Sequence, residues 1–346
     1  MLPVIHNLLR TSPVFVLGFI LSSTAWAGTI RDDKSDSSYT NAGSTYSAVG
    51  ALRVDANSGT FGCSGSLIGD GSWVLTAGHC SDGATAGNAT FSLGDTMTNF
   101  FLTGDTYAVD QVVPHPKWDG SLSKGYDIAL MHLSSDGGTG ASIYRGNSEA
   151  GSVGTIVGFG LTGTGLTGAT NLDGKKRAGD NLIDGFFRTP GKTSRLFATD
   201  FTDPSGGSNS FGSEAPENNE FLAVFGDSGG PVFIGSEIAG VNSFIVDNNG
   251  NGQFADYGDY GGATRVSAFA DWIDSVLTGS GGEDGGGDDG GGGPPPGRGG
   301  GRFNAFGATS LFVSANQAVP EPSTFLLMAL GLVAITFRKS GSKQSL

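Results

Sequence analysis

The chain of 346 residues is poor in cysteine, with two residues, and in histidine, with four, and only 15% of its residues are charged. Two cysteines cannot hold together a disulfide-rich fold, so stability must come from a buried apolar core, for which the chain is long enough. Basic residues are also scarce, since 19 lysines and arginines stand against 33 aspartates and glutamates. The net charge of −14 argues against nucleic acid or an anionic membrane surface as the main partner.

No apolar run in the chain reaches the roughly 20 residues of a stable membrane-spanning helix. The first run, residues 14–21, follows Arg10 and precedes Ala25-Trp26-Ala27, a small-x-small cleavage site. This order is typical of a secretory signal peptide over residues 1–27, whose removal by signal peptidase would leave Gly28 first. A membrane anchor is the alternative, which the short run disfavours.

Glycine, in contrast, is abundant at 61 residues, as expected for many turns between short strands. Strand-like runs alternate with turn signals, which predicts an all-β sandwich or pair of barrels. These runs are residues 48–54, 73–77, 89–93, 107–113, 128–133, 155–159, 221–225, 232–234 and 238–244. Residues 28–47 are polar and strand-poor, and the sequence gives them no role. In residues 267–277 apolar side chains recur at helical spacing, which predicts one amphipathic helix.

The composition changes abruptly at residue 279. Residues 279–318 are rich in glycine, with a run of prolines, and predict a flexible linker without a core. Val319-Pro320-Glu321-Pro322-Ser323 then precedes an apolar run, residues 325–337, and a basic end. This tail, residues 319–346, resembles the PEP-CTERM sorting signal of Gram-negative bacteria, which implies exosortase processing and a transient membrane association through a short transmembrane segment. An ordinary C-terminal membrane anchor is the alternative.

Three short segments contain the residue types of a nucleophilic hydrolase. In chain order they are Thr76-Ala77-Gly78-His79-Cys80, Tyr126-Asp127-Ile128-Ala129-Leu130 and Gly226-Asp227-Ser228-Gly229-Gly230-Pro231. Each contains one member of a Ser-His-Asp system. Together they strongly resemble the chymotrypsin/trypsin family of serine proteases, in which the three members occur in this order. The similarity extends roughly over residues 48–277.

That resemblance implies a protease domain over residues 28–278, folded as two six-stranded antiparallel β-barrels with the site between them and a C-terminal helix packed on the second barrel. It also implies a secreted serine endopeptidase that cleaves protein or peptide substrates through an acyl-enzyme intermediate. The alternative is a catalytically silent binding module of the cell surface or matrix on the same fold. With the tail, the expected location is beyond the inner membrane of a Gram-negative bacterium, at the cell surface or in the extracellular matrix.

The resemblance also implies a role for each residue of the three segments. Ser228 is the expected nucleophile, His79 the base that takes its proton, and Asp127 the group that orients and stabilises the imidazole. The backbone amides of Gly226 and Ser228 are expected to form the oxyanion hole. A glycine at position 226 permits the backbone orientation that aims its amide inward.

Substrate-binding residues follow from the same resemblance. Leu222, six residues before the nucleophile, is expected at the base of the primary pocket. Ser243, Phe244 and Ile245 are expected along its wall, on the strand whose backbone pairs with the substrate. Because Leu222 carries no charge, cleavage after Lys or Arg is disfavoured and small or medium apolar residues are predicted.

Two features of the family bear on the remaining residues. Its members bridge the cysteine after the catalytic histidine to one on the preceding strand, so a disulfide between Cys63 and Cys80 is expected, with two free thiols as the alternative. The family's Ile-Val-Gly-Gly-like start, whose amine pairs with the aspartate before the nucleophile, is missing here. Either a processed terminus near residues 28–30 or another group is expected to pair with Asp227.

Two further patterns are weaker. Gly158-x-Gly160-x-x-Gly163 matches a dinucleotide fingerprint but lacks a following helix, which favours turns. Asp247-x-Asn249-x-Asn251-Gly252 resembles half of a calcium loop, although a hairpin turn is favoured. The other histidines, which are His6, His115 and His132, show no metal-ligand spacing. No cofactor and no metal are therefore predicted.

Overall fold

The computed structural model describes residues 28–57, 59–98, 101–187, 194–212 and 215–279. The predicted signal peptide, the sorting tail with its short transmembrane segment, and all of the predicted linker after its first residue lie outside the described residues. In the described ranges, no helix is both long enough and apolar enough to cross a membrane.

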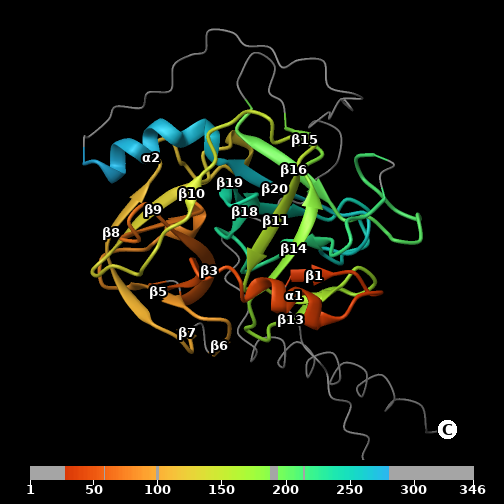
Figure 1. Ribbon diagram of the computed structural model, residues 1–346, viewed down its shortest axis with the longest axis horizontal. Helices are drawn as coiled ribbons and strands as arrows, with labels where there is room; N and C mark the ends of the chain where they lie inside the picture. The colour runs from red at the N-terminus through yellow and green to blue at the C-terminus, as the bar shows by residue number, and fades with distance from the viewer. Residues whose placement is uncertain (1–27, 58, 99–100, 188–193, 213–214, 280–346) are drawn as a thin grey trace, which may run out of the picture.

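The first half of the described chain forms a closed barrel of six antiparallel strands, in the order β2-β3-β4-β9-β8-β5 (orange to yellow in Figure 1). The strands are β2 (Val49–Ala56), β3 (Gly59–Ile68), β4 (Trp73–Thr76), β5 (Ala89–Leu93), β8 (Thr106–Pro114) and β9 (Ala129–Leu133). Apolar side chains such as Leu52, Val54 and Phe91 are fully buried, because alternate residues of a barrel strand point inward.

The second half forms a sheet in the order β14-β11-β18-β19-β20-β16-β15, with β10 attached to β19. The strands are β10 (Ser142–Ile143), β11 (Val153–Gly158), β14 (Arg177–Leu182), β15 (Gly185–Phe186), β16 (Leu196–Asp200), β18 (Pro231–Ile234), β19 (Glu237–Val246) and β20 (Tyr260–Arg265). The predicted fold class is confirmed, with one difference. Among the described residues β14 and β15 do not pair, so this sheet is a half-barrel and not a second closed barrel. Strand β15 is only two residues long, which leaves too short an edge to close the sheet.

Residues 28–47, to which the sequence assigns no element, contain one strand and one helix. Strand β1 (Gly28–Ile30) lies between β12 (Thr162–Thr164) and β17 (Phe221–Leu222) in a four-stranded sheet with β13 (Gly168–Asn171) at its edge. Helix α1 (Asp36–Gly43) follows and contacts β14 (Figure 1). All three residues of β1 are buried, so the start of the described chain is an integral part of the second half.

The C-terminal helix is present, in two parts. A 3₁₀ turn, η3 (Val266–Phe269), leads into α2 (Ala270–Leu277). This helix contacts both halves of the molecule. The rings of Phe269 and Trp272 each lie 5.0 Å from the ring of His115, which follows β8 of the first barrel, and η3 contacts β19 of the second half. The remaining small elements are β6 (Met97–Thr98), β7 (Phe101–Leu102), η1 (His79–Ser81) and η2 (Leu122–Lys124).

Candidate active site

Strand pairing in the first barrel brings the histidine and aspartate segments together. Strand β4 ends at Thr76 and pairs there with Ala129 of β9. His79 begins the turn η1 just after β4, and Asp127 precedes β9. His79 Nδ1 lies 2.8 Å from Asp127 Oδ2, and the backbone amide of His79 donates to Oδ1 of the same carboxylate at 2.8 Å.

Asp127 is fully buried, and the second half of the molecule helps to hold it. Ser243 of β19 donates its hydroxyl hydrogen bond to Asp127 Oδ2, and Thr264 of β20 donates to the Asp127 carbonyl at 2.9 Å. An ionised carboxylate only accepts hydrogen bonds, so the Nδ1 of His79 must be the protonated nitrogen. The opposite nitrogen, Nε2, is then left with its lone pair and can act as a base.

The electrostatics of His79 follow from this pairing. Burial on its own would lower the pKa of His79, but the negative charge of Asp127 and its hydrogen bond act in the opposite direction. The net effect raises the pKa of His79 above its usual 6.5. The side chain of His79 is 9% exposed, so the rest of the molecule covers most of it.

Ser228 lies in a glycine-rich loop between β17 and β18. The loop needs glycine at two points, because Gly226 and Gly229 have φ angles of 96° and 79°, in the left-handed region. Within the part of the chain that the structure describes, no hydrogen bond joins the Ser228 hydroxyl to His79. Such bonds are often long in resting enzymes and tighten when substrate binds. The amides of Gly226 and Ser228 likewise donate no hydrogen bond to any described group.

Asp227, which lies between Gly226 and Ser228 in the sequence, ties the loop to the neighbouring backbone. Its carboxylate accepts hydrogen bonds from the amide of Gly160 at 2.7 Å and from the amide of Val224 at 2.9 Å. The group is fully buried, and burial raises its pKa to about 7 although both hydrogen bonds act to lower it. A buried carboxylate of this kind favours a cation as its partner.

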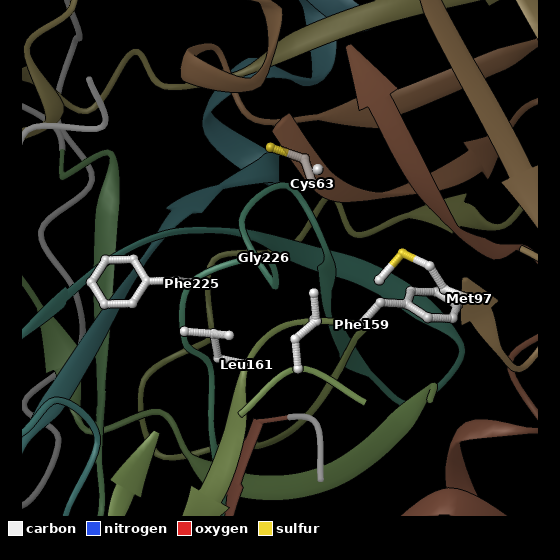
Figure 2. Close-up of a pocket in the computed structure, with 8 residues that line it drawn as sticks. Cys63, Met97, Phe159, Leu161, Phe225 and Gly226 are labelled. Carbon is white, nitrogen blue, oxygen red and sulfur yellow. The ribbon is translucent and has the colours of Figure 1, made fainter. Parts of the chain in front are cut away.

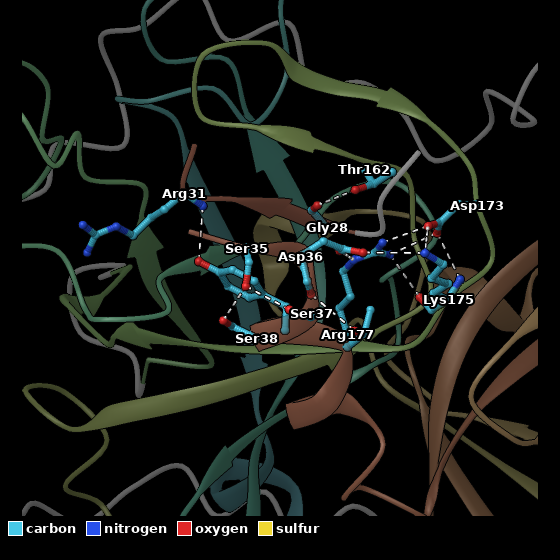
Figure 3. A network of polar contacts seen from close by, with 12 residues as sticks. Gly28, Arg31, Ser35, Asp36, Ser37, Ser38, Thr162, Asp173, Lys175 and Arg177 are labelled. Atoms are coloured by element: carbon cyan, nitrogen blue, oxygen red, sulfur yellow. Dashed lines mark hydrogen bonds and ion pairs between the residues drawn. The ribbon is translucent and has the colours of Figure 1, made fainter. Parts of the chain in front are cut away.

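The start of the described chain binds the segment that follows Gly160, and Figure 3 shows its contact with Thr162. The backbone nitrogen of Gly28 donates to the carbonyl of Leu161 at 2.5 Å, and Thr162 Oγ1 donates to the carbonyl of Gly28 at 3.0 Å. A Cβ at position 28 would lie 1.8 Å from the ring of Phe221, so only glycine fits there.

A second contact holds the N-terminal segment, residues 28–43, in place. Arg177 of β14 is fully buried and pairs with Asp36 of α1 and with Asp173 (Figure 3). The Arg177 Nη2 to Asp173 Oδ2 distance is 2.8 Å. Burial would lower the pKa of Arg177, but the two carboxylates outweigh it and raise the pKa. Nothing in the local sequence indicates this network, because Asp36 and Arg177 are 141 positions apart.

The predicted disulfide is present. Cys63 of β3 and Cys80 of η1 are bonded to each other, which excludes the two free thiols. Cys80 Sγ also lies 3.6 Å from the carbonyl oxygen of Ser228, so the bridge abuts the serine loop. Cys63, Cys80 and His79 lie close enough together to resemble a metal site, but bonded sulfurs carry no thiolate with which to bind an ion.

The predicted substrate residues converge in part. Leu222 is fully buried in an apolar cluster with Phe201, Val224, Ala255 and Tyr257, against which Ile245 packs. A Cβ on Gly261 would lie 3.3 Å from Leu222, which is tighter than ordinary van der Waals contact. Phe244 lies apart from this cluster, with its ring over Gly262 and 5.5 Å from the ring of Phe187.

An apolar hollow beside the serine loop has no counterpart among the sequence predictions. Figure 2 shows that it opens next to Gly226 and Phe225. Its other lining residues are Gly62, Cys63, Met97, Phe159, Leu161 and Leu172. They come from both halves of the molecule and from several loops, so no sequence pattern could have identified the hollow.

The acidic segment with the weak calcium pattern forms the connection between β19 and β20. Asp247 accepts from the amides of Gly250 and Gly252, at 2.7 and 2.9 Å. Asp256 accepts from the side chains of Asn249 and Asn251. The connection is longer than the predicted hairpin turn, and its carboxylates bind groups of the same loop.

Comparisons with known proteins agree with this geometry. A family model described as Trypsin matches residues 40–181 and 205–273, and the model of the PEP-CTERM protein-sorting motif matches residues 318–340. Serine protease SP24D of Anopheles gambiae is 31% identical over 221 residues, which are 62% of this chain and 72% of that protein. Anionic trypsin of Canis lupus familiaris is 28% identical over 278 residues, 77% of this chain and 98% of that protein. The solved structure of HL collagenase matches with a TM-score of 0.51 at 21% identity. The match covers 73% of this chain and 98% of the collagenase chain.

Proposed function

Because the chain belongs to the trypsin family of serine proteases, we propose that it is an exported serine endopeptidase that hydrolyses peptide bonds through Ser228, His79 and Asp127. The observation that carries this proposal is the hydrogen-bonded pair of His79 and the buried Asp127, which leaves His79 Nε2 as a base. Further support comes from the glycine-rich loop, which carries Ser228 and in which the amides of Gly226 and Ser228 donate no hydrogen bond to any described group.

In the proposed reaction, Ser228 Oγ attacks the scissile carbonyl while His79 Nε2 takes the hydroxyl proton. The oxygen of the tetrahedral intermediate accepts hydrogen bonds from the amides of Gly226 and Ser228. Protonated His79, stabilised by Asp127, returns its proton to the leaving amine, which leaves an ester on Ser228. Water activated by His79 then hydrolyses this ester and restores the serine.

We further propose that the substrate side chain before the scissile bond is apolar. The support is the apolar cluster around Leu222, which offers no counter-charge to Lys or Arg. The segment Ser243, Phe244 and Ile245 would pair with the substrate backbone by strand addition. The hollow beside Gly226 offers a second apolar surface to the same substrate.

Export and sorting form the second part of the proposal. Signal peptidase would cleave after Ala27, and an exosortase-type enzyme would process the tail matched by the sorting-motif model. The short run, residues 325–337, would hold the chain at the inner membrane only transiently. The mature enzyme would then act on proteins or peptides at the cell surface or in the extracellular matrix.

Labelling with a fluorophosphonate, followed by peptide mapping, tests the proposal against the silent binding module. Wild-type protein should carry the label on Ser228. Ser228→Ala should carry none and should lose peptide hydrolysis while keeping its thermal unfolding curve, because only the nucleophile is removed. His79→Ala should lose activity to a similar extent, since nucleophile and base act as a unit. A folded wild-type chain without label would favour the binding module.

A further inference from the structure

Ser64 connects the first barrel to the serine loop of the second half. It follows Cys63 on β3 and is fully buried. Its hydroxyl donates to the carbonyl oxygen of Gly226 at 2.9 Å and accepts from the amide of Phe159 at 3.2 Å. Both partners belong to the second half, so a single hydroxyl reaches across the boundary between the two halves.

The main chain of Ser64 reaches the same loop. Its amide donates to the carbonyl oxygen of Ser228 at 2.8 Å, and its own carbonyl accepts from Thr76 Oγ1 at 2.9 Å. Ser64 therefore holds two carbonyls of the loop, those of Gly226 and Ser228. These are the two residues whose amides are proposed to bind the oxyanion.

The position of the Gly226 amide depends on that anchor. Glycine at a φ of 96° has no Cβ to restrict its backbone, so the orientation of its peptide groups must be fixed by outside contacts. The peptide group that joins Gly226 to Asp227 is held at both ends. Its amide, that of Asp227, donates to the carbonyl of Val224 at 2.9 Å. The Ser64 hydroxyl fixes the other end of the same peptide group, its carbonyl oxygen.

Oxyanion donors act only when they are aimed in advance at the position that the charged oxygen will occupy. A misplacement of about 1 Å can reduce the rate about 10²-fold. We infer that Ser64 is a positioning residue of the oxyanion hole. By holding the carbonyl oxygen of Gly226, it fixes the backbone of this glycine and so the direction in which the Gly226 amide points. The inference rests on the proposed function, since it assigns work to the same loop.

The test compares Ser64→Ala with Ser66→Ala. Ser66 is a matched control, because it lies two residues further along β3, is 1% exposed, and has a hydroxyl without a hydrogen-bond partner among the described residues. Removing an oxyanion donor outright costs about 10²–10³-fold in kcat. Loosening one should cost less, and we expect Ser64→Ala to lower kcat about tenfold with KM nearly unchanged. Ser66→Ala should match the wild type, and Ser64→Thr, which keeps the hydroxyl, should recover most of the loss.

A pair of inhibitors of one peptide sequence gives an independent readout. A peptide aldehyde forms a tetrahedral adduct whose oxygen occupies the oxyanion hole, whereas the corresponding peptide amide binds without one. Ser64→Ala should weaken the aldehyde about tenfold and leave the amide unchanged, a difference that a purely structural role would not produce. If Ser64→Ala does not fold, Ser64→Gly serves the same comparison.

The outcomes separate this inference from the proposed function. Wild-type labelling of Ser228 by a fluorophosphonate, together with equal kcat and equal aldehyde affinity in the Ser64→Ala and Ser66→Ala variants, would overturn the inference alone. Equal weakening of the aldehyde and the amide would also overturn it, because it indicates general damage to the site. A folded wild-type chain without label at Ser228 would overturn both.

Discussion

The buried carboxylate of Asp227 leads to a quantitative prediction about the N-terminus. Among the described residues Asp227 forms no ion pair, and burial raises its pKa from 3.8 to about 7. A shift of about 3 pKa units corresponds to about 4 kcal/mol against the ionised form. The folded state therefore binds this proton more tightly than the unfolded state does. The contribution of Asp227 to the free energy of unfolding should then be greatest below pH 4 and fall as the pH rises towards 7.

A positive charge near Asp227 would remove this penalty. The backbone nitrogen of Gly28 binds the carbonyl of Leu161, and the amide of the preceding residue, Gly160, binds Asp227. If cleavage after Ala27 makes Gly28 the first residue, its α-ammonium group lies in the neighbourhood of the carboxylate. An adjacent cation lowers the pKa of a carboxyl group and stabilises the ionised form.

The perturbation is the addition of one residue. A chain that begins at Gly28, released from a cleavable fusion, is compared with a chain that begins at Ala27. The free energy of unfolding in urea should be similar for the two at pH 4. At pH 7 the chain that begins at Gly28 should be the more stable, by up to about 4 kcal/mol, which is the full penalty on Asp227. Using the difference between the chains cancels the titration of all other carboxylates.

Asp227→Asn supplies the control for this comparison, because it removes the charge and keeps one of the two oxygens that accept the amides of Gly160 and Val224. In that background the two chains should respond to pH in the same way. A pH-independent difference between the chains, or one that persists in Asp227→Asn, would refute the assignment of Gly28 as the partner of Asp227. Equal stability of both chains at pH 7 would refute it as well.

Three further outcomes are expected. The kcat/KM of the wild type should fall at acid pH with an apparent pKa above 6.5. The reason is that Asp127 raises the pKa of His79, and protonated His79 cannot accept the serine proton. A midpoint below 6.5 would contradict this. A peptide library should show cleavage after apolar residues, since Leu222 offers no charge, and a dominant Lys or Arg signal would be inconsistent with that pocket. A chain limited to residues 28–279 should match the full chain in thermal unfolding and kcat/KM, because the last helix among the described residues ends at Leu277. An unfolded or inactive product would assign the tail to the enzyme.

The sequence predicted the parts of the fold that have a strong local pattern. Strands β2, β5 and β9 carry consecutive or alternating apolar residues, and each coincides with a predicted run. Strand β14 does not stand out, since Arg177, Asp180 and Asn181 interrupt it. Its position is decided by partners distant in sequence, such as Asp36, which neutralises the buried Arg177. The strand β1 was missed for the same reason, because a three-residue strand is specified by the two strands between which it lies.

The site shows the same division between local and distant information. The chemical identities of His79, Asp127 and Ser228 could be read from short segments, because each occurs within a recognisable motif. Their placement depends on contacts between residues that are far apart. Ser243 reaches Asp127 across 116 positions, and Ser64 reaches Gly226 across 162.

These two bonds run in opposite directions across the molecule. Ser243, from the second half, fixes the aspartate of the first barrel, while Ser64, from the first barrel, fixes the serine loop of the second half. Each half thus orients a part of the proposed site that the other half carries. A change in the relative position of the halves would disturb the proposed base and the proposed oxyanion hole together, so the proposed activity requires both halves in place. A short motif can indicate which residues react, but their alignment is a property of the boundary between the two halves.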